Sequence, residues 1–152
     1  MHVLLLTENP SDHSLFQESI VILHSNYSFD GCESVAEVWA KLTSAKIPLP
    51  NVIFVDYELS ASYGHELLDM LKDTAELSDA PVIVMADSAD KEDVLVTYGS
   101  QAACFVVLPK DRESRQRKIQ ACLEFWGKYA ELPQLRRWWD SGTWHDHPAR
   151  PA

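Results

Sequence analysis

Short apolar runs, separated by longer amphipathic stretches, constrain the fold of this chain more than any other feature. The clearest runs span residues 2–6, 51–56, 81–85 and 103–107. They are rich in β-branched and aromatic residues and do not alternate with polar ones, which is typical of parallel strands covered on both faces. Residues 27–32 are a weaker strand candidate, nearer an edge of the sheet.

The stretches between these runs carry apolar residues at helical spacing. Helices are predicted over residues 11–25, 34–45, 63–73, 89–98 and 111–130. The second begins with Ser34 and Glu37, the spacing of a capping box. Strand and helix therefore alternate five times. This order predicts the α/β class: a three-layer sandwich built on a (βα)5 doubly wound parallel sheet.

The length of the chain fits one domain. It has 152 residues, and domains most often contain about 100–150. Pro133 ends the last predicted helix, so we expect a domain over residues 1–133 and a C-terminal extension over residues 134–152. No run approaches the roughly 18 apolar residues that a membrane-spanning helix needs, and no membrane partner is expected.

The net charge argues against one class of partner, and the cysteine content indicates the redox environment of the chain. The formal net charge is -10, which argues against nucleic acid as a partner because nucleic-acid binding needs a basic surface. The 3 cysteines are an odd number without metal-type spacing. Reduced thiols and a cytoplasmic location are the expectation.

Acidic side chains follow two of the predicted strands. Glu8 comes after the first strand, Asp56 ends the third strand, and Glu58 follows it closely. Sites in open parallel sheets form beyond the carboxyl ends of the strands, where the strand order reverses. Carboxylates that converge there need a cation, and Mg²⁺ is the expected ion.

Several segments, in this order and spacing, carry a resemblance to a known family. They are LTENPSD at 6–12, VIFVD at 52–56, GHELL at 64–68, PVIV at 81–84, VVLP at 106–109, EFW at 124–126 and LP at 132–133. Together they resemble the CheY-like receiver domain of two-component response regulators. Among receiver domains, the chain most resembles the stand-alone receivers that partner bacterial phytochromes.

The resemblance implies a set of roles. Asp56 stands at the position that accepts a phosphoryl group from a histidine kinase, the expected partner. The two positions that hold Mg²⁺ after the first strand are here Thr7 and Glu8, and the backbone carbonyl of Glu58 completes that metal site.

Three departures from the family pattern predict a degenerate pocket. Thr7 replaces an acid, Ala86 replaces a hydroxyl side chain, and Leu108 replaces the lysine before Pro109. Phosphoryl transfer depends on charge neutralisation and positioning, so we expect weak or no phosphorylation and a function exerted by protein–protein contact.

Two neighbouring residues are candidates to replace the missing groups. Lys110 lies two residues past Leu108 and has a flexible side chain, and Ser88 follows Ala86 closely. The competing interpretations are a solvated lysine and a helix N-cap.

Other functions stay open at this point. Asp56 is a working Mg²⁺-dependent phosphoacceptor in the first alternative. The second is a flavodoxin-like binder of a small ligand, although the acidic loop after the first strand would repel a phosphate. No Ser, His and acid follow the strands in a triad-like order, so no enzymatic activity is expected.

Aromatic residues near the C-terminus predict an interface. Phe125 and Trp126 lie late in the last helix, and Trp138 and Trp139 lie in the extension. Tryptophan is enriched at interface hot spots. The resemblance to receiver domains implies that this contact is a symmetric homodimer.

Overall fold

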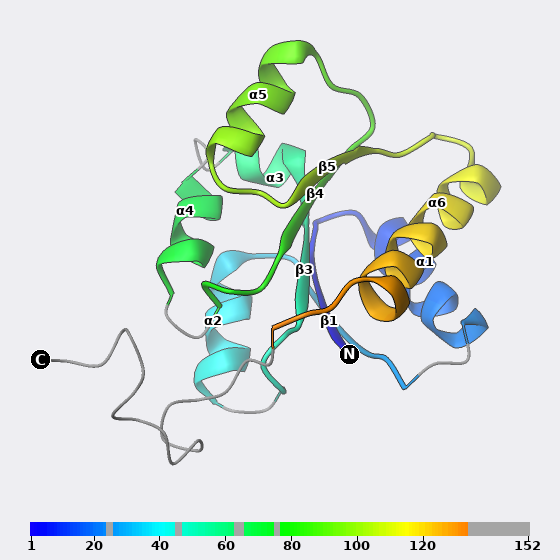
Figure 1. Cartoon of the computed structure of the whole chain (residues 1–152), viewed down its shortest axis with the longest axis horizontal. Coiled ribbons are helices and arrows are strands. Elements are labelled where there is room, and N and C mark those ends of the chain that lie inside the picture. Colours follow the sequence, from blue (N-terminus) through cyan, green and yellow to red (C-terminus); the bar gives the residue numbers. More distant parts are fainter. Residues whose placement is uncertain (24–25, 45–46, 63–65, 75–76, 134–152) are drawn as a thin grey trace, which may run out of the picture.

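The computed structural model describes residues 1–23, 26–44, 47–62, 66–74 and 77–133. Its core is a five-stranded parallel sheet in the order β2-β1-β3-β4-β5 (Figure 1). The elements are β1 (His2–Leu6), α1 (Pro10–Ile22), β2 (Ser28–Cys32), α2 (Val35–Thr43), β3 (Val52–Asp56), α3 (Tyr57–Ser62), α4 (Glu66–Asp73), β4 (Val82–Ala86), α5 (Lys91–Gly99), β5 (Cys104–Val107), α6 (Arg112–Glu124) and the π-helical turn η1 (Phe125–Tyr129).

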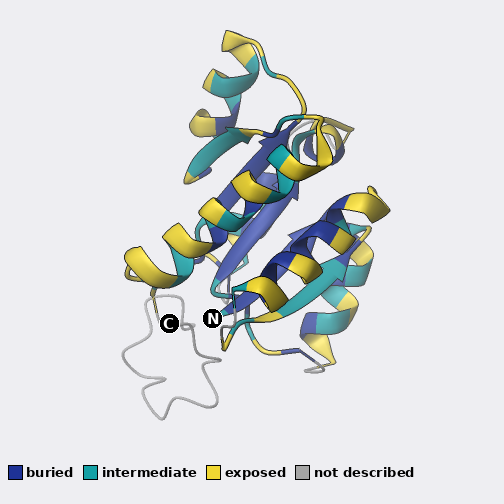
Figure 2. Ribbon diagram, turned by 90° about the vertical axis from the view of Figure 1, so that its right-hand side faces the viewer, coloured by how far each residue is buried: buried dark blue, intermediate teal, exposed yellow. Residues whose placement is uncertain are grey.

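Helices cover both faces of the sheet, as the three-layer prediction requires. The helices α1 and α6 pack on one face, where Phe16 and Ile119 meet Phe54 of β3. On the other face, α2, α3 and α4 pack against a second cluster that includes Leu4 and Leu68. Figure 2 shows the result: buried central strands, and helices whose outer faces are exposed.

The strand predictions agree with the structure to within about a residue at most ends, and the helix predictions are less accurate. The helix α3 was not predicted at all, because it follows Asp56 directly and is only six residues long. The last predicted helix is divided into α6 and η1. Ser34 does accept from the Glu37 N–H, but the Glu37 carboxylate accepts from the Glu33 N–H rather than from that of Ser34.

The strand order reverses between β1 and β3, since β1 pairs with both β2 and β3. Thr7 follows β1 and Asp56 ends β3 at this edge, so the topology brings together two residues that the sequence keeps apart. No helix in the described part of the chain is long and apolar enough to span a bilayer.

Candidate functional site

Both carboxylate oxygens of Asp56 accept hydrogen bonds from uncharged donors. The Thr7 hydroxyl donates to Asp56 Oδ2 at 2.9 Å, and the Glu58 backbone N–H donates to Asp56 Oδ1 at 3.0 Å. The Thr7 side chain is fully buried, and its Oγ1 also accepts from the Asn9 N–H at 3.1 Å. A second bond fixes the backbone here, since His13 Nε2 lies 2.8 Å from the Thr7 carbonyl oxygen.

Beside Asp56, Arg115 joins three segments of the chain. Its Nε and Nη2 donate to the two oxygens of Asp12 at 2.8 and 2.9 Å, which is a bidentate pair. Its Nη1 donates to Asp87 in the loop after β4 at 2.6 Å. The hydrogen bond to Asp12 raises the pKa of Arg115 further above its ordinary value, so the guanidinium is always charged.

Local sequence explains why Asp12 and Arg115 meet. Each lies near the beginning of a helix that starts at the carboxyl edge of the sheet: Asn9 caps α1, and Asp111 caps α6. Because α1 and α6 pack side by side on the same face, their first turns are neighbours. Asn9 and Asp111 are typical N-cap residues, whose side-chain oxygens accept from backbone N–H groups of the first turn.

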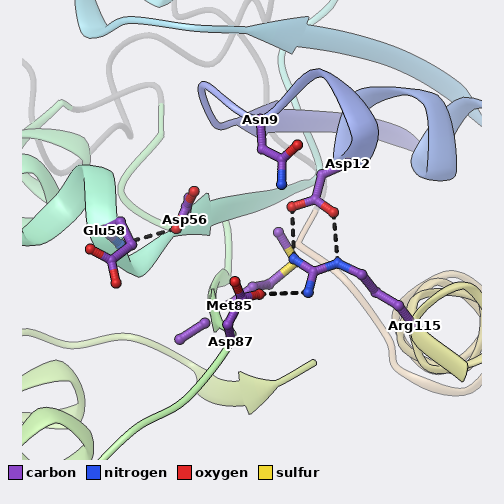
Figure 3. A pocket seen from close by; sticks show the side chains of 8 residues that line it. Asn9, Asp12, Asp56, Glu58, Met85, Asp87 and Arg115 are labelled. Carbon is purple, nitrogen blue, oxygen red and sulfur yellow. Dashed lines mark hydrogen bonds and ion pairs between the residues drawn. The ribbon is translucent and has the colours of Figure 1, made fainter. Parts of the chain in front are cut away.

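These side chains surround a small hollow of about 40 Å³. It is lined by Asn9, Asp12, Asp56, Glu58, Met85, Ala86, Asp87 and Arg115. Figure 3 shows Arg115 held between Asp12 and Asp87 on one side of the hollow, with Asp56 and Glu58 on the other. We call this hollow the acceptor pocket.

Ala86 and Leu108, two of the positions where the sequence departs from the receiver pattern, lie in different surroundings. Ala86 lines the acceptor pocket and brings no hydroxyl to it. Leu108 does not line it: its side chain is 1% exposed and packs with Ile119 and Leu123 in the core beneath α6. A lysine at that position would therefore have to leave an apolar environment.

The two candidate replacements lie outside the pocket lining. Lys110 and Ser88 are both exposed, and neither lines the acceptor pocket. Ser88 is not the N-cap of α5 either. Asp90 has that role, in a capping box with Asp93.

The expected metal ligands do not assemble. Glu8 is exposed and does not line the acceptor pocket, whereas Asp56 and Glu58 do. Successive side chains of an extended segment point in opposite directions, so burial of Thr7 turns Glu8 outward. Within the described ranges, no group of three or more His, Cys, Asp or Glu side chains is arranged to hold a metal ion. The structure therefore does not bring Glu8 together with Asp56 and Glu58.

The residue after Asp56 connects the pocket to α5. The Tyr57 hydroxyl donates to Asp93 Oδ1 at 2.7 Å, and this hydrogen bond raises the pKa of Tyr57 to about 12. The Tyr57 ring also contacts Phe105 of β5, with ring centroids 5.5 Å apart. Asp93 lies in the first turn of α5, so the beginning of α3, β5 and α5 meet at the Tyr57 side chain.

The expected interface residues are only partly described. Phe125 is 51% exposed, and its ring contacts Trp126 with centroids 5.1 Å apart. Both line an open groove of about 560 Å³ between β5 and α6. Trp138 and Trp139, with the rest of the extension, lie outside the described residues.

Sequence reasoning missed Arg115 and Asp12 as pocket residues. The pair is separated by 103 positions, and neither residue belongs to a strand end. A weak signal was available: Asp12 follows Asn9-Pro10 in a helix N-cap pattern, which places its first turn at the carboxyl edge of the sheet.

Comparison with known proteins agrees with this fold. No protein-family model matches the sequence. The chain is 24% identical over 135 residues to response regulator Rcp1 of Synechocystis sp., covering 86% of this chain and 92% of that protein. It is 28% identical over 86 residues to the two-component response regulator ORR6 of Oryza sativa, covering 57% of this chain and 49% of that protein.

Solved structures show the same fold. The Mn²⁺-bound form of Rcp1 superposes with a TM-score of 0.77 and 23% identity, over 88% of this chain and 99% of that one. The phosphorylated cyanobacterial phytochrome response regulator RcpA superposes with a TM-score of 0.77 and 24% identity, over 88% and 98%. In sequence and in fold, this chain is similar to the receiver domains of two-component response regulators.

Proposed function

We propose that this protein is a single-domain receiver that signals by protein–protein contact, with phosphorylation of Asp56 weak or absent. The observation that carries the proposal is the bonding of the acceptor pocket. Both oxygens of Asp56 accept from uncharged donors, while Arg115 is bonded to Asp12 and Asp87.

Charge explains why this arrangement disfavours a phosphoryl group. A phosphoaspartate adds up to nearly two negative charges and three acceptor oxygens. The pocket lining already holds the carboxylates of Asp12, Asp56, Glu58 and Asp87 against one guanidinium. Ala86 offers no hydroxyl, and the Leu108 side chain is buried in the core. Losing one preorganised donor can cost about 2.7–4 kcal/mol in a transition state.

A direct phosphorylation assay tests the proposal. The protein is incubated with acetyl phosphate and MgCl₂, and its intact mass is measured, with Asp56→Asn as the control. We expect at most a small fraction of wild-type molecules to gain a phosphoryl group. A stoichiometric adduct that Asp56→Asn removes would overturn the proposal.

A second variant makes the assay sharper. Ala86→Ser puts a hydroxyl into the pocket lining with little added volume. If the missing hydroxyl is part of the defect, this variant gains more adduct than the wild type. Ser88→Ala is the matched control, because Ser88 is exposed and outside the lining.

A working phosphoacceptor is the second candidate function. It is supported by two relatives, one solved with Mn²⁺ and one solved in a phosphorylated form. Asp56 is only partly buried, so it is open to a donor. Under this function a histidine kinase is the upstream partner, and a divalent ion such as Mg²⁺ joins the pocket during transfer.

The groove between β5 and α6 supports a homodimer within the same proposal. It is lined mostly by apolar atoms from Val106, Ala121, Cys122, Phe125 and Trp126. Such an open apolar surface is typical of a protein interface. We propose a second copy of the chain as its occupant, in a symmetric pair.

A further inference from the structure

We propose that the guanidinium of Arg115 is the resident cation of the acceptor pocket, so that the carboxylates of Asp12 and Asp87 are paired within the chain rather than by a divalent metal ion. The inference concerns the same pocket as the proposed function. Its test measures metal binding and not phosphorylation, so each can fail without the other.

The first support is the bonding of Arg115. Its side chain is 12% exposed and Asp12 is 4% exposed. The pair is bidentate, which is the strongest geometry available between a guanidinium and a carboxylate. Leaving one member of such a buried pair unmatched is costly, so Arg115 stays in the pocket at rest.

The second support is the distribution of charge around the hollow. The lining holds four carboxylates and one guanidinium. Figure 3 shows Asp12 and Asp87 bonded to Arg115, with Asp56 and Glu58 on the opposite side of the hollow. Arg115 uses both oxygens of Asp12 and one oxygen of Asp87. A metal ion entering the hollow would have to compete for those oxygens and would meet the repulsion of a fixed positive charge.

The third support is that the remaining acids are poorly arranged for a metal. Asp56 is already bonded through both oxygens to Thr7 and to the Glu58 N–H, and Glu8 points away. This agrees with the lack of a metal-type cluster within the described ranges.

A Mn²⁺ titration tests the proposal, with calorimetry for affinity and electron paramagnetic resonance for free Mn²⁺. Arg115→Gln should bind Mn²⁺ at least about tenfold more tightly than the wild type, because a unit charge a few ångströms away is removed. Arg112→Gln is the matched control. It removes the same charge from the same helix, but Arg112 bonds the exposed Glu18 outside the pocket.

Further variants identify the site and protect the test against misfolding. Adding Asp87→Asn to Arg115→Gln should reduce the gain in affinity, because Asp87 is one of the two carboxylates that Arg115 releases. If circular dichroism shows that Arg115→Gln is unfolded, Mn²⁺ should restore its helical signal, because the ion then supplies the positive charge that the buried Asp12 carboxylate has lost. Equal affinities for Arg115→Gln and Arg112→Gln, or an unfolded Arg115→Gln that Mn²⁺ does not refold, would overturn the proposal.

Discussion

Thr7 sets the resting state of Asp56. A carboxylate in the acceptor pocket needs donors, and here they are a hydroxyl and a backbone N–H rather than a cation. The Thr7 hydroxyl both donates to Asp56 and accepts from the Asn9 N–H, so it connects the end of β3 to the beginning of α1. One residue therefore joins the acceptor position to the helix that carries Asp12.

Replacing this hydroxyl should destabilise the protein. Thr7→Val keeps the shape of the buried side chain and removes its bonds, and a hydrogen bond to a charged group is worth about 1.5–3 kcal/mol. We expect the free energy of unfolding in urea to fall by about this amount. In an Asp56→Asn background the loss should be smaller. Equal losses in both backgrounds would show that the Thr7–Asp56 bond contributes nothing.

His2 makes the stability of the fold depend on pH. Burial lowers the pKa of His2, although Asp30, whose Oδ2 is 3.0 Å from His2 Nε2, acts in the opposite direction. The folded protein therefore binds the proton more weakly than the unfolded chain, where histidine titrates near 6.5. The stability supplied by neutral His2 is complete above that pH and is lost as the pH falls towards the lowered pKa.

The variant His2→Gln isolates this effect. The free energy of unfolding should fall less steeply between pH 7.5 and pH 5 in the variant than in the wild type. All other titrating groups are common to the two proteins and cancel in the comparison. Urea unfolding at several pH values measures both slopes, and parallel slopes would refute the assignment.

At the scale of elements, the His13 side chain of α1 lies directly against Gly31 of β2. A Cβ atom on Gly31 would clash with His13 Nδ1, so a larger residue fits there only if the imidazole moves. The His13 ring is held there by its bond to the Thr7 carbonyl oxygen. The close approach therefore fixes the segment that positions the Thr7 hydroxyl.

Gly31→Ala should break this contact. The added methyl group forces the imidazole away from the Thr7 carbonyl oxygen, and overpacking of this kind typically costs about 1–3 kcal/mol. We expect a matching loss in the free energy of unfolding in urea. His13→Ala in the same background should recover part of it, and no recovery would place the strain elsewhere.

The helix α6 contributes residues to the acceptor pocket and leads into the open groove. Its first turn supplies Arg115 to the pocket, and its last turn continues into η1 with Phe125 and Trp126 on the open groove. One helix thus contacts both the acceptor pocket and the proposed dimer surface.

At the scale of the whole molecule, the exposed aromatic residues predict self-association. Phe125→Ser removes apolar area from the groove and should shift the chain from dimer towards monomer in sedimentation equilibrium at micromolar concentration. Val21→Ser is the matched control, since Val21 on α1 is 64% exposed but does not line the groove. The same distribution of species for wild type and Phe125→Ser would argue against a homodimer through this surface.

The architecture could be predicted from sequence because it depends on local patterns. Apolar runs such as residues 52–56 have to be buried on both faces, and alternation with helices then permits a parallel sheet. The helix α3 escaped prediction because its six residues are too few to show a helical period, and its position depends on what packs around Leu59.

Some features of the acceptor pocket could likewise be predicted from the sequence, and others could not. The sequence by itself determined that Asp56 ends a central strand and that Ala86 brings no hydroxyl, since both are set by position along a strand. Only the tertiary structure decided that Arg115 meets Asp12, because the packing of α1 against α6 joins residues 103 positions apart. Long-range pairs of this kind leave no local periodicity in a single sequence. The place of Arg115 in this pocket therefore follows only from the folded structure.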